Sequence, residues 1–167
     1  MLRPPSALGR RCNSGFTLLE MMVAVALLAL VASLAAPGMQ RLIAAQRLRS
    51  VGYDLVADLT LARSEAIKRA AQVSIVPTSG SWANGWTVQT VVGSTALGQR
   101  GAIHGLSVNS TTPPAGIVFE ANGRATVAGG GTARFGFSNS YGNHRCITVD
   151  PSGRPRSVTS ACTTSTT

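Results

Sequence analysis

The sequence predicts an α+β protein in which a long N-terminal helix, apolar in its first half, packs its second half on an antiparallel β-sheet. Three patterns predict this fold. An apolar run extends from Met21 to Ala36, the helical spacing of apolar residues continues beyond Pro37, and the spacing changes to alternation after Ala71. About 130 of the 167 residues follow the apolar run, which suits one small domain.

The first 37 residues are predicted to form a leader, residues 1–15, and a transmembrane helix, residues 16–37. The leader carries three basic residues: Arg3, Arg10 and Arg11. The 21 residues from Phe16 to Ala36 make about 31 Å of helix, enough to span the hydrocarbon core of a bilayer. One carboxylate, Glu20, lies in this segment. Because a charge at membrane depth is costly, its default interpretation is functional.

Two simpler explanations of this segment fit less well. A secretory signal has a basic region, an apolar stretch and a small-residue cleavage site, for which residues 32–36 would serve. However, Glu20 would interrupt its apolar region, and the apolar periodicity continues past Pro37. A plain transmembrane anchor has the right length but does not explain Gly15, Phe16 and Glu20 together.

The run Gly15-Phe16-Thr17-Leu18-Leu19-Glu20 before an apolar helix resembles the class III signal of type IV pilins and type II secretion pseudopilins. The resemblance implies a type IV pilin-like fold, cleavage by a prepilin peptidase between Gly15 and Phe16, and N-methylation of Phe16. It also implies that Glu20 pairs with the N-terminal ammonium of a neighbouring subunit. In hydrocarbon, a carboxylate and an ammonium that lie side by side offset each other's desolvation.

Residues 38–71 are predicted to form the amphipathic second half of the helix. Pro37 frees a carbonyl in the preceding turn and is expected to kink or break the helix, after which the pattern resumes and ends near Ala71. The predicted buried stripe is Leu48, Val51, Leu55, Leu59, Ala62 and Ala66. Glu65 and Arg69 have the spacing of a surface ion pair.

Residues 72–167 are predicted to form a β-rich periplasmic domain, with a disordered tail at residues 163–167. The expected strands lie at Val73 and Ile75, Val88 to Val92, Ile117 to Phe119, Ala125 to Val127, Thr132 to Ser138, Arg145 to Val149, and Arg156 to Thr159. Asn122-Gly123 and Pro151-Ser152-Gly153 predict hairpin turns. Trp82 and Trp86 are expected to fix a turn onto the core rather than to bind a ligand.

A second resemblance covers almost the whole soluble part of the chain. Leu61 to Arg69, the turn from Trp82 to Trp86, and Arg145-Cys146-Ile147 leading to Gly153-Arg154-Pro155-Arg156 are similar in kind and order to the GspH/FimT family of minor pilins and pseudopilins. Some FimT-type members are implicated in DNA uptake through a Gly-Arg-x-Arg motif near the C-terminus. The resemblance therefore implies Arg154 and Arg156 as candidate DNA-binding residues.

The charge balance agrees with a polyanionic partner. The sequence contains 15 basic and six acidic residues, and removal of the three leader arginines leaves a net charge of +6. Five arginines and one acid, Asp150, follow Glu120. Double-stranded DNA would be bound through its phosphates, with little sequence preference. If Arg154 and Arg156 do not bind it, the next candidates are Arg124, Arg134 and Arg145. The alternative is that Arg154 and Arg156 are solvated hairpin residues of a GspH-type minor pseudopilin for protein secretion that binds no DNA.

Three cysteines become two after removal of the leader, because Cys12 lies within it. Cys146 and Cys162 would face the periplasm, and an even count in an oxidising compartment suggests a disulfide. Two free thiols are the alternative. A disulfide would bracket Arg154 and Arg156 in a closed loop of about 16 residues.

No catalytic constellation is present in the sequence. Gly129-Gly130-Gly131 lacks the strand, helix and lysine of a phosphate loop, and His104 and His144 lack metal-ligand spacing. A His144–Asp150 pair is conceivable as a base and its orienter, but a surface histidine is the simpler interpretation. We expect no enzyme activity, cofactor or metal.

The expected partners are the prepilin peptidase, other pilin or pseudopilin subunits, the inner membrane and double-stranded DNA. The expected location is the cell inner membrane, with a single pass and a periplasmic domain, and from there the pilus or pseudopilus. The choice between a type IV pilus and a type II secretion machine stays open.

Overall fold

A computed structural model describes residues 15–108, 115–127 and 130–162. The chain divides into two compact units, Met1–Met39 and Gln40–Thr167. The predicted leader up to residue 14 and the predicted tail at residues 163–167 lie outside the described residues.

One helix, α1 (Leu18–Arg69), contains Pro37 without interruption, so Pro37 does not break it. The Thr17 hydroxyl caps its start by accepting a 3.2 Å hydrogen bond from the backbone N–H of Glu20. The helix ends two residues before the predicted Ala71. Ala70 adopts a left-handed conformation at φ +48°, and its N–H bonds the Ile67 carbonyl. The N–H of Ala71 bonds the Ala66 carbonyl, completing a Schellman termination.

In the first unit, the side chains of α1 are exposed throughout the apolar run. Within the described residues, α1 has the length and composition needed to cross a membrane. A surface of this size and apolarity requires lipid or partner helices to cover it.

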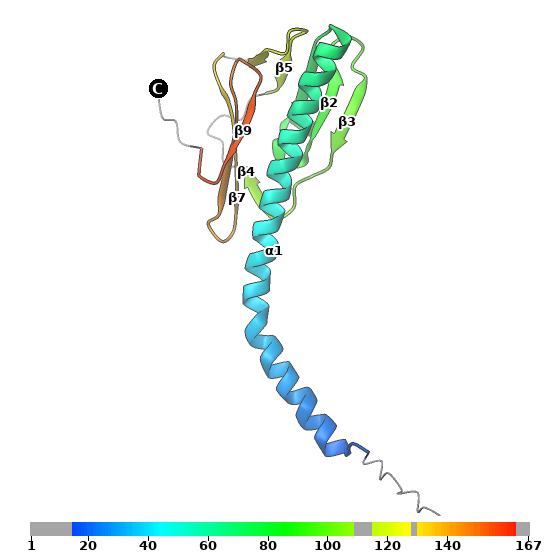
Figure 1. Cartoon of the computed structure of the whole chain (residues 1–167), viewed down its shortest axis with the longest axis vertical. Coiled ribbons are helices and arrows are strands. Elements are labelled where there is room, and N and C mark those ends of the chain that lie inside the picture. The colour runs from blue at the N-terminus through cyan, green and yellow to red at the C-terminus, as the bar shows by residue number, and fades with distance from the viewer. Residues whose placement is uncertain (1–14, 109–114, 128–129, 163–167) are drawn as a thin grey trace, which may run out of the picture. The chain divides into compact units, whose positions relative to one another are not determined.

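The second unit contains two antiparallel sheets rather than one (Figure 1). The five-stranded sheet has the order β3-β2-β1-β5-β6, and the four-stranded sheet has the order β4-β7-β8-β9. The strands are β1 (Val73–Pro77), β2 (Trp86–Thr90), β3 (Ala96–Arg100), β4 (Leu106–Val108), β5 (Ile117–Phe119), β6 (Ala125–Val127), β7 (Ala133–Asn139), β8 (His144–Val149) and β9 (Pro155–Val158).

The core forms where the second half of α1 lies along both sheets (Figure 1). The predicted stripe is buried except at Val51, which is partly buried. The side chains that meet it from the strands and turns include Trp82, Trp86, Ile75, Phe119, Phe135, Phe137 and Ile147. The predicted packing of one long helix on antiparallel β-structure is confirmed.

The tryptophan turn is fixed onto the core, as predicted. Trp82 and Trp86 are each 2% exposed. The indole N–H of Trp86 donates a 2.9 Å hydrogen bond to the Asp58 carboxylate, and Trp82 lies edge-on to Phe135 with ring centroids 4.6 Å apart. Asp58 also accepts a 3.0 Å hydrogen bond from Arg100 Nε, so this helical carboxylate ties two strands to α1.

Both predicted hairpins are present, as β5–β6 and β8–β9. Two strands, β3 and β4, were not expected. The strand expected to reach Val92 ends at Thr90, because Val91 to Ser94 turn the chain into β3 and leave Val92 87% exposed.

Candidate functional site

The first candidate site is the start of α1. Gly15 and Phe16 precede the helix, and Glu20 lies in its first turn. All three residues are exposed. A carboxylate in the first turn interacts favourably with the positive end of the helix dipole. The geometry therefore presents an accessible anion within an apolar surface, next to the proposed cleavage point.

The second candidate site is built on the turns of the two hairpins. In the β5–β6 turn, the Gly123 N–H bonds the Glu120 carbonyl at 2.8 Å. In the β8–β9 turn, the Gly153 N–H bonds the Asp150 carbonyl at 2.8 Å. The N–H of Ala125 donates a 3.2 Å hydrogen bond to the Pro151 carbonyl and so joins the two turns.

Gly153 is required where the turns meet. Its φ is +76°, and a Cβ there would collide with the carbonyl oxygen of Gly123, itself at φ +77°. An arginine follows each of these glycines, Arg124 in one turn and Arg154 in the other. The turn contact therefore brings together two arginines that are 30 positions apart in sequence.

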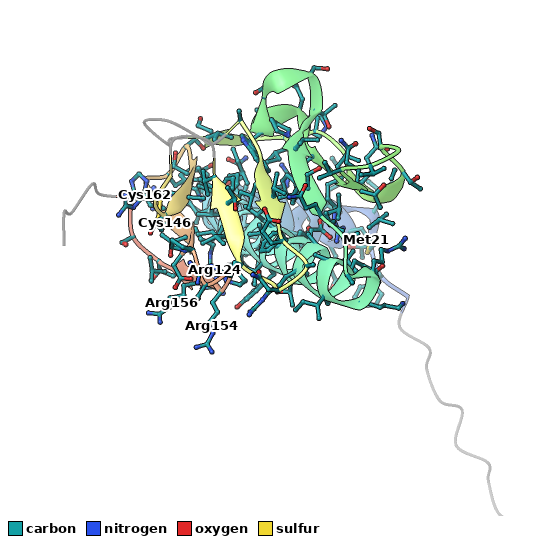
Figure 2. The ribbon with its side chains drawn as sticks, turned by 90° about the horizontal axis from the view of Figure 1, so that it is seen from above. Met21, Arg124, Cys146, Arg154, Arg156 and Cys162 are labelled. Atoms are coloured by element: carbon teal, nitrogen blue, oxygen red, sulfur yellow. A yellow bond between two sulfur atoms is a disulfide. The ribbon has the colours of Figure 1, made fainter. Side chains whose placement is uncertain are left out.

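Three exposed arginines define what we call the basic patch: Arg124, Arg154 and Arg156. Figure 2 shows the three side chains gathered on one side of the domain. Arg154 and Arg156 were predicted from the sequence, and Arg124 was expected only as a substitute for them. The shared pattern of a turn glycine followed by arginine was the available signal for Arg124.

Arg63 reaches the β5–β6 turn from α1. Its Nε lies 3.1 Å from where a Cβ on Gly123 would be, and it has no hydrogen-bond partner among the described residues. The half-buried Arg63 thus adds positive charge beneath the basic patch. Nothing in the sequence signalled this position.

Asp150 stabilises the β8–β9 turn as an anion. The hydrogen bond from the Ser152 hydroxyl holds the pKa of the Asp150 carboxyl below its usual range. Desolvation opposes this, whereas the backbone N–H groups of Arg154 and Ser152 and the charge of Arg156 act in the same direction. The carboxylate therefore orders the turn but offsets only part of the positive charge of the basic patch.

Arg134 and Arg145 were the other candidates for DNA contact, and the structure places them differently. Arg134 of β7 lies opposite Thr148 of β8, and Thr148 lies opposite Arg156 of β9. Arg134 and Arg156 therefore lie in one row across the four-stranded sheet. Arg145 is only 8% exposed and faces α1. Arg145 was therefore wrong as a candidate for an exposed DNA contact, because strand alternation turns it inward.

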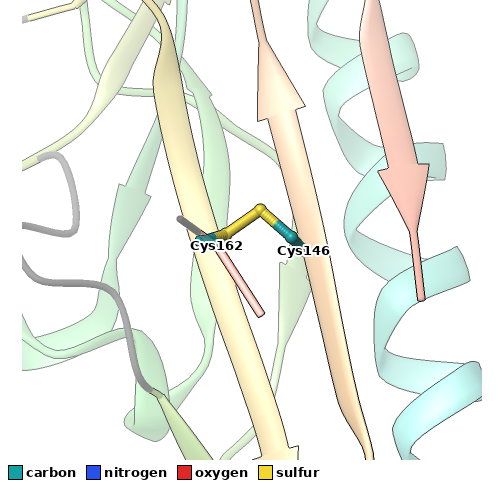
Figure 3. Close-up of a disulfide and its surroundings, with 2 residues drawn as sticks. All are labelled: Cys146 and Cys162. Atoms are coloured by element: carbon teal, nitrogen blue, oxygen red, sulfur yellow. A yellow bond between two sulfur atoms is a disulfide. The ribbon is translucent and has the colours of Figure 1, made fainter. Parts of the chain in front are cut away.

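The predicted cysteine pair is joined. Cys146 of β8 and Cys162 form a disulfide with their Cα atoms 5.1 Å apart (Figure 3). The closed loop contains β9 and the Arg154 turn. The disulfide and the turn contact thus restrain the basic patch from two directions.

The histidines do not build a reactive centre. His144 begins β8 and Asp150 follows its end, so about 20 Å of extended strand separates them and the imagined base and orienter do not meet. The described residues hold no group of three or more His, Cys, Asp or Glu side chains suited to a metal ion.

Comparison with known proteins gives two family matches. Residues 10–36 match the prokaryotic N-terminal methylation motif, and residues 53–153 match the family of type II transport protein GspH. No curated protein matches the chain.

Two crystal structures of the Pseudomonas aeruginosa (strain PAO1) type IV minor pilin FimU share the fold. In space group P21 the identity is 21% and the TM-score 0.56, with 66% of this chain and 87% of FimU covered. In space group P65 the values are 23% and 0.55, with 66% and 92% covered. Because the GspH match spans more than half of the sequence, this chain belongs to the GspH family and has the minor pilin fold.

Proposed function

We propose that this protein is a membrane-anchored subunit that joins a pilus or pseudopilus through the first half of α1. The observation that carries the proposal is the exposed apolar run of α1 with Glu20 in its first turn, inside the matched methylation motif. The family is one of structural pilin subunits, which are not enzymes. The subunit would wait in the inner membrane with residues 38–162 in the periplasm, and then move into the filament.

Processing at Gly15 and Phe16 prepares this assembly. A prepilin peptidase removes residues 1–15, and methylation of the new amine at Phe16 follows. The freed ammonium would lie close to the Glu20 carboxylate of a neighbouring helix, where the two charges offset each other in an apolar environment.

The test is the intact mass of the protein from its native host. We expect a chain that begins at Phe16 and carries one added methyl group. Gly15→Leu, which places a bulky residue at the cleavage point, is expected to leave the leader attached. An uncut wild-type leader, or a mature N-terminus near Ala36, would contradict the proposal.

A second role is favoured by the basic patch. We propose that Arg124, Arg154 and Arg156 bind the phosphates of double-stranded DNA. Each guanidinium can contact two phosphate oxygens at once. The turn contact and the Cys146–Cys162 disulfide hold the patch in place, so binding loses little conformational entropy.

DNA affinity should depend on salt, because phosphate contacts release counterions. If the protein neutralises about four phosphates, log affinity should fall against log salt with a slope of about −3.6. Arg154→Ala with Arg156→Ala should reduce that slope by up to about two units, and Arg124→Ala by roughly one more. Fluorescence anisotropy with the full chain in a non-ionic detergent measures these slopes.

The matched control is Arg47→Ala with Arg49→Ala, which removes the same charge from two exposed positions of α1. An equal loss of slope in this control would mean that net charge, and not the basic patch, sets the affinity. No binding by the wild type at low salt would leave a GspH-type pseudopilin for protein secretion that binds no DNA.

A further inference from the structure

A second positively charged feature lies away from the basic patch, in a surface pocket of about 340 Å³. Its walls are one face of α1, the β7–β8 turn with the start of β8, and the segment after β9. The lining residues are Ala45, Leu48, Arg49, Gly142, Asn143, His144, Arg145, Thr159 and Ser160.

The ionisable residues that line this pocket are all basic. It contains two arginines, Arg49 and Arg145, together with His144, and no carboxylate. The remaining polar groups are one side-chain amide and two hydroxyls, all able to donate hydrogen bonds. A lining of donors and positive charges suits an anion with several acceptor oxygens.

Arg145 is the decisive member because it is 8% exposed yet lacks a counter-ion. Its Nη1 donates a 2.9 Å hydrogen bond to the Ser157 hydroxyl, and its guanidinium lies over the Tyr53 ring, 5.4 Å from the centroid. No carboxylate of the described residues pairs with it. By contrast, the more exposed Arg100 pairs with both Asp54 and Asp58.

The backbone of α1 makes room for this buried charge. Gly52 lies beneath Arg145, and a Cβ at position 52 would collide with the arginine side chain. Burying an unpaired charge is costly, so an anion that reaches Arg145 gains an interaction that water at the surface would weaken.

We propose that this pocket binds one oxyanion group, a carboxylate or a phosphate, held by Arg49 and Arg145 with His144 at the rim. A recess of this volume can hold a free anion or an acidic side chain of another protein chain. The pocket shares no residue with the basic patch, so this site does not depend on DNA binding.

The test is thermal unfolding of the full chain in a non-ionic detergent. A ligand that binds only the folded state raises the unfolding temperature in a saturable way. Inorganic phosphate and sodium acetate should therefore stabilise the protein more than sodium chloride of equal ionic strength. A pentaglutamate peptide that binds more tightly than free glutamate would identify a protein-borne carboxylate, and equal affinities would identify a free anion.

Arg49→Gln is the deciding variant, because Arg49 is exposed and its loss leaves the core intact. We expect it to weaken phosphate binding by about tenfold or more, as for loss of a charge-assisted hydrogen bond. Arg145→Gln should weaken binding further, but it also removes the packing over Tyr53. Arg47→Gln, an exposed arginine outside this pocket, is the matched control and should bind like wild type.

Two results overturn the proposal. One is an unfolding temperature that responds equally to phosphate, acetate, pentaglutamate and chloride. The other is phosphate binding that survives Arg49→Gln unchanged. If that binding is instead lost in Arg47→Gln, the anion belongs to the separate pocket lined by Arg47 and Arg100.

Discussion

Glu20→Ala is expected to leave the protein in the membrane but to exclude most of it from sheared filaments. The substitution removes a charge from an apolar helix, so insertion should if anything improve. The proposed pairing with the ammonium of a neighbouring subunit would be lost. Loss of one partner of a buried ion pair costs about 3–5 kcal/mol, which corresponds to at least a hundredfold lower association. Immunoblotting of membranes and of sheared filaments measures both quantities.

Glu65→Ala is the matched control for Glu20→Ala. It removes a carboxylate from the same helix, but one that pairs locally with Lys68 and Arg69. This control should enter filaments as wild type does. Normal incorporation of Glu20→Ala would contradict the proposed role of Glu20 in assembly.

Removing the disulfide has the largest expected effect on stability. Cys146→Ser with Cys162→Ser should lower the free energy of unfolding by about 2–5 kcal/mol, as for native disulfides in small secreted domains. The bridge spans a sequence separation of 16, for which chain entropy alone predicts about 3 kcal/mol. Urea unfolding of the two proteins measures the difference.

A redox control belongs with that experiment. Reduced wild type should unfold at the same urea concentration as the double serine variant, and the variant should not respond to reductant. Thiols that can be alkylated in periplasmic wild-type protein before reduction would contradict a disulfide in the native state.

Elements with strong local signals could be predicted from the sequence. The stripe from Leu48 to Ala66 repeats at helical spacing, and all but one of its members are buried. Asn122-Gly123 and Pro151-Ser152-Gly153 encode their turns within a few residues, so both hairpins were found. The end of the helix was misplaced by two residues because its termination uses Ala70, not a glycine, in the left-handed conformation.

Elements defined by pairing alone could not be predicted. Ala96–Arg100 contains a glycine and two polar residues, and it becomes β3 only because β2 lies beside it. Leu106–Val108 is three residues long and pairs with the distant β7. The separation into two sheets depends on such long-range pairings, which hydrophobic periodicity does not encode.

The same distinction applies to the functional residues. Arg154 and Arg156 were expected at an exposed hairpin. Arg154 lies in its turn and Arg156 lies in β9, and both are exposed. The approach of Arg124 required a hydrogen bond between two hairpins, and the approach of Arg63 required the packing of α1 against one of them. The burial of Arg145 depends on which face of β8 carries its side chain. Its charge suggested an exposed position, but the side chain is buried.

Pro155 affects the solubility of the free domain. It lies in β9, the outer strand of the four-stranded sheet, and outer strands offer unpaired backbone groups to other chains. Proline has no N–H to donate, and the flanking Arg154 and Arg156 would place like charges opposite each other if two copies met at this edge. We therefore expect the Arg-Pro-Arg sequence to protect the free domain from edge-to-edge aggregation.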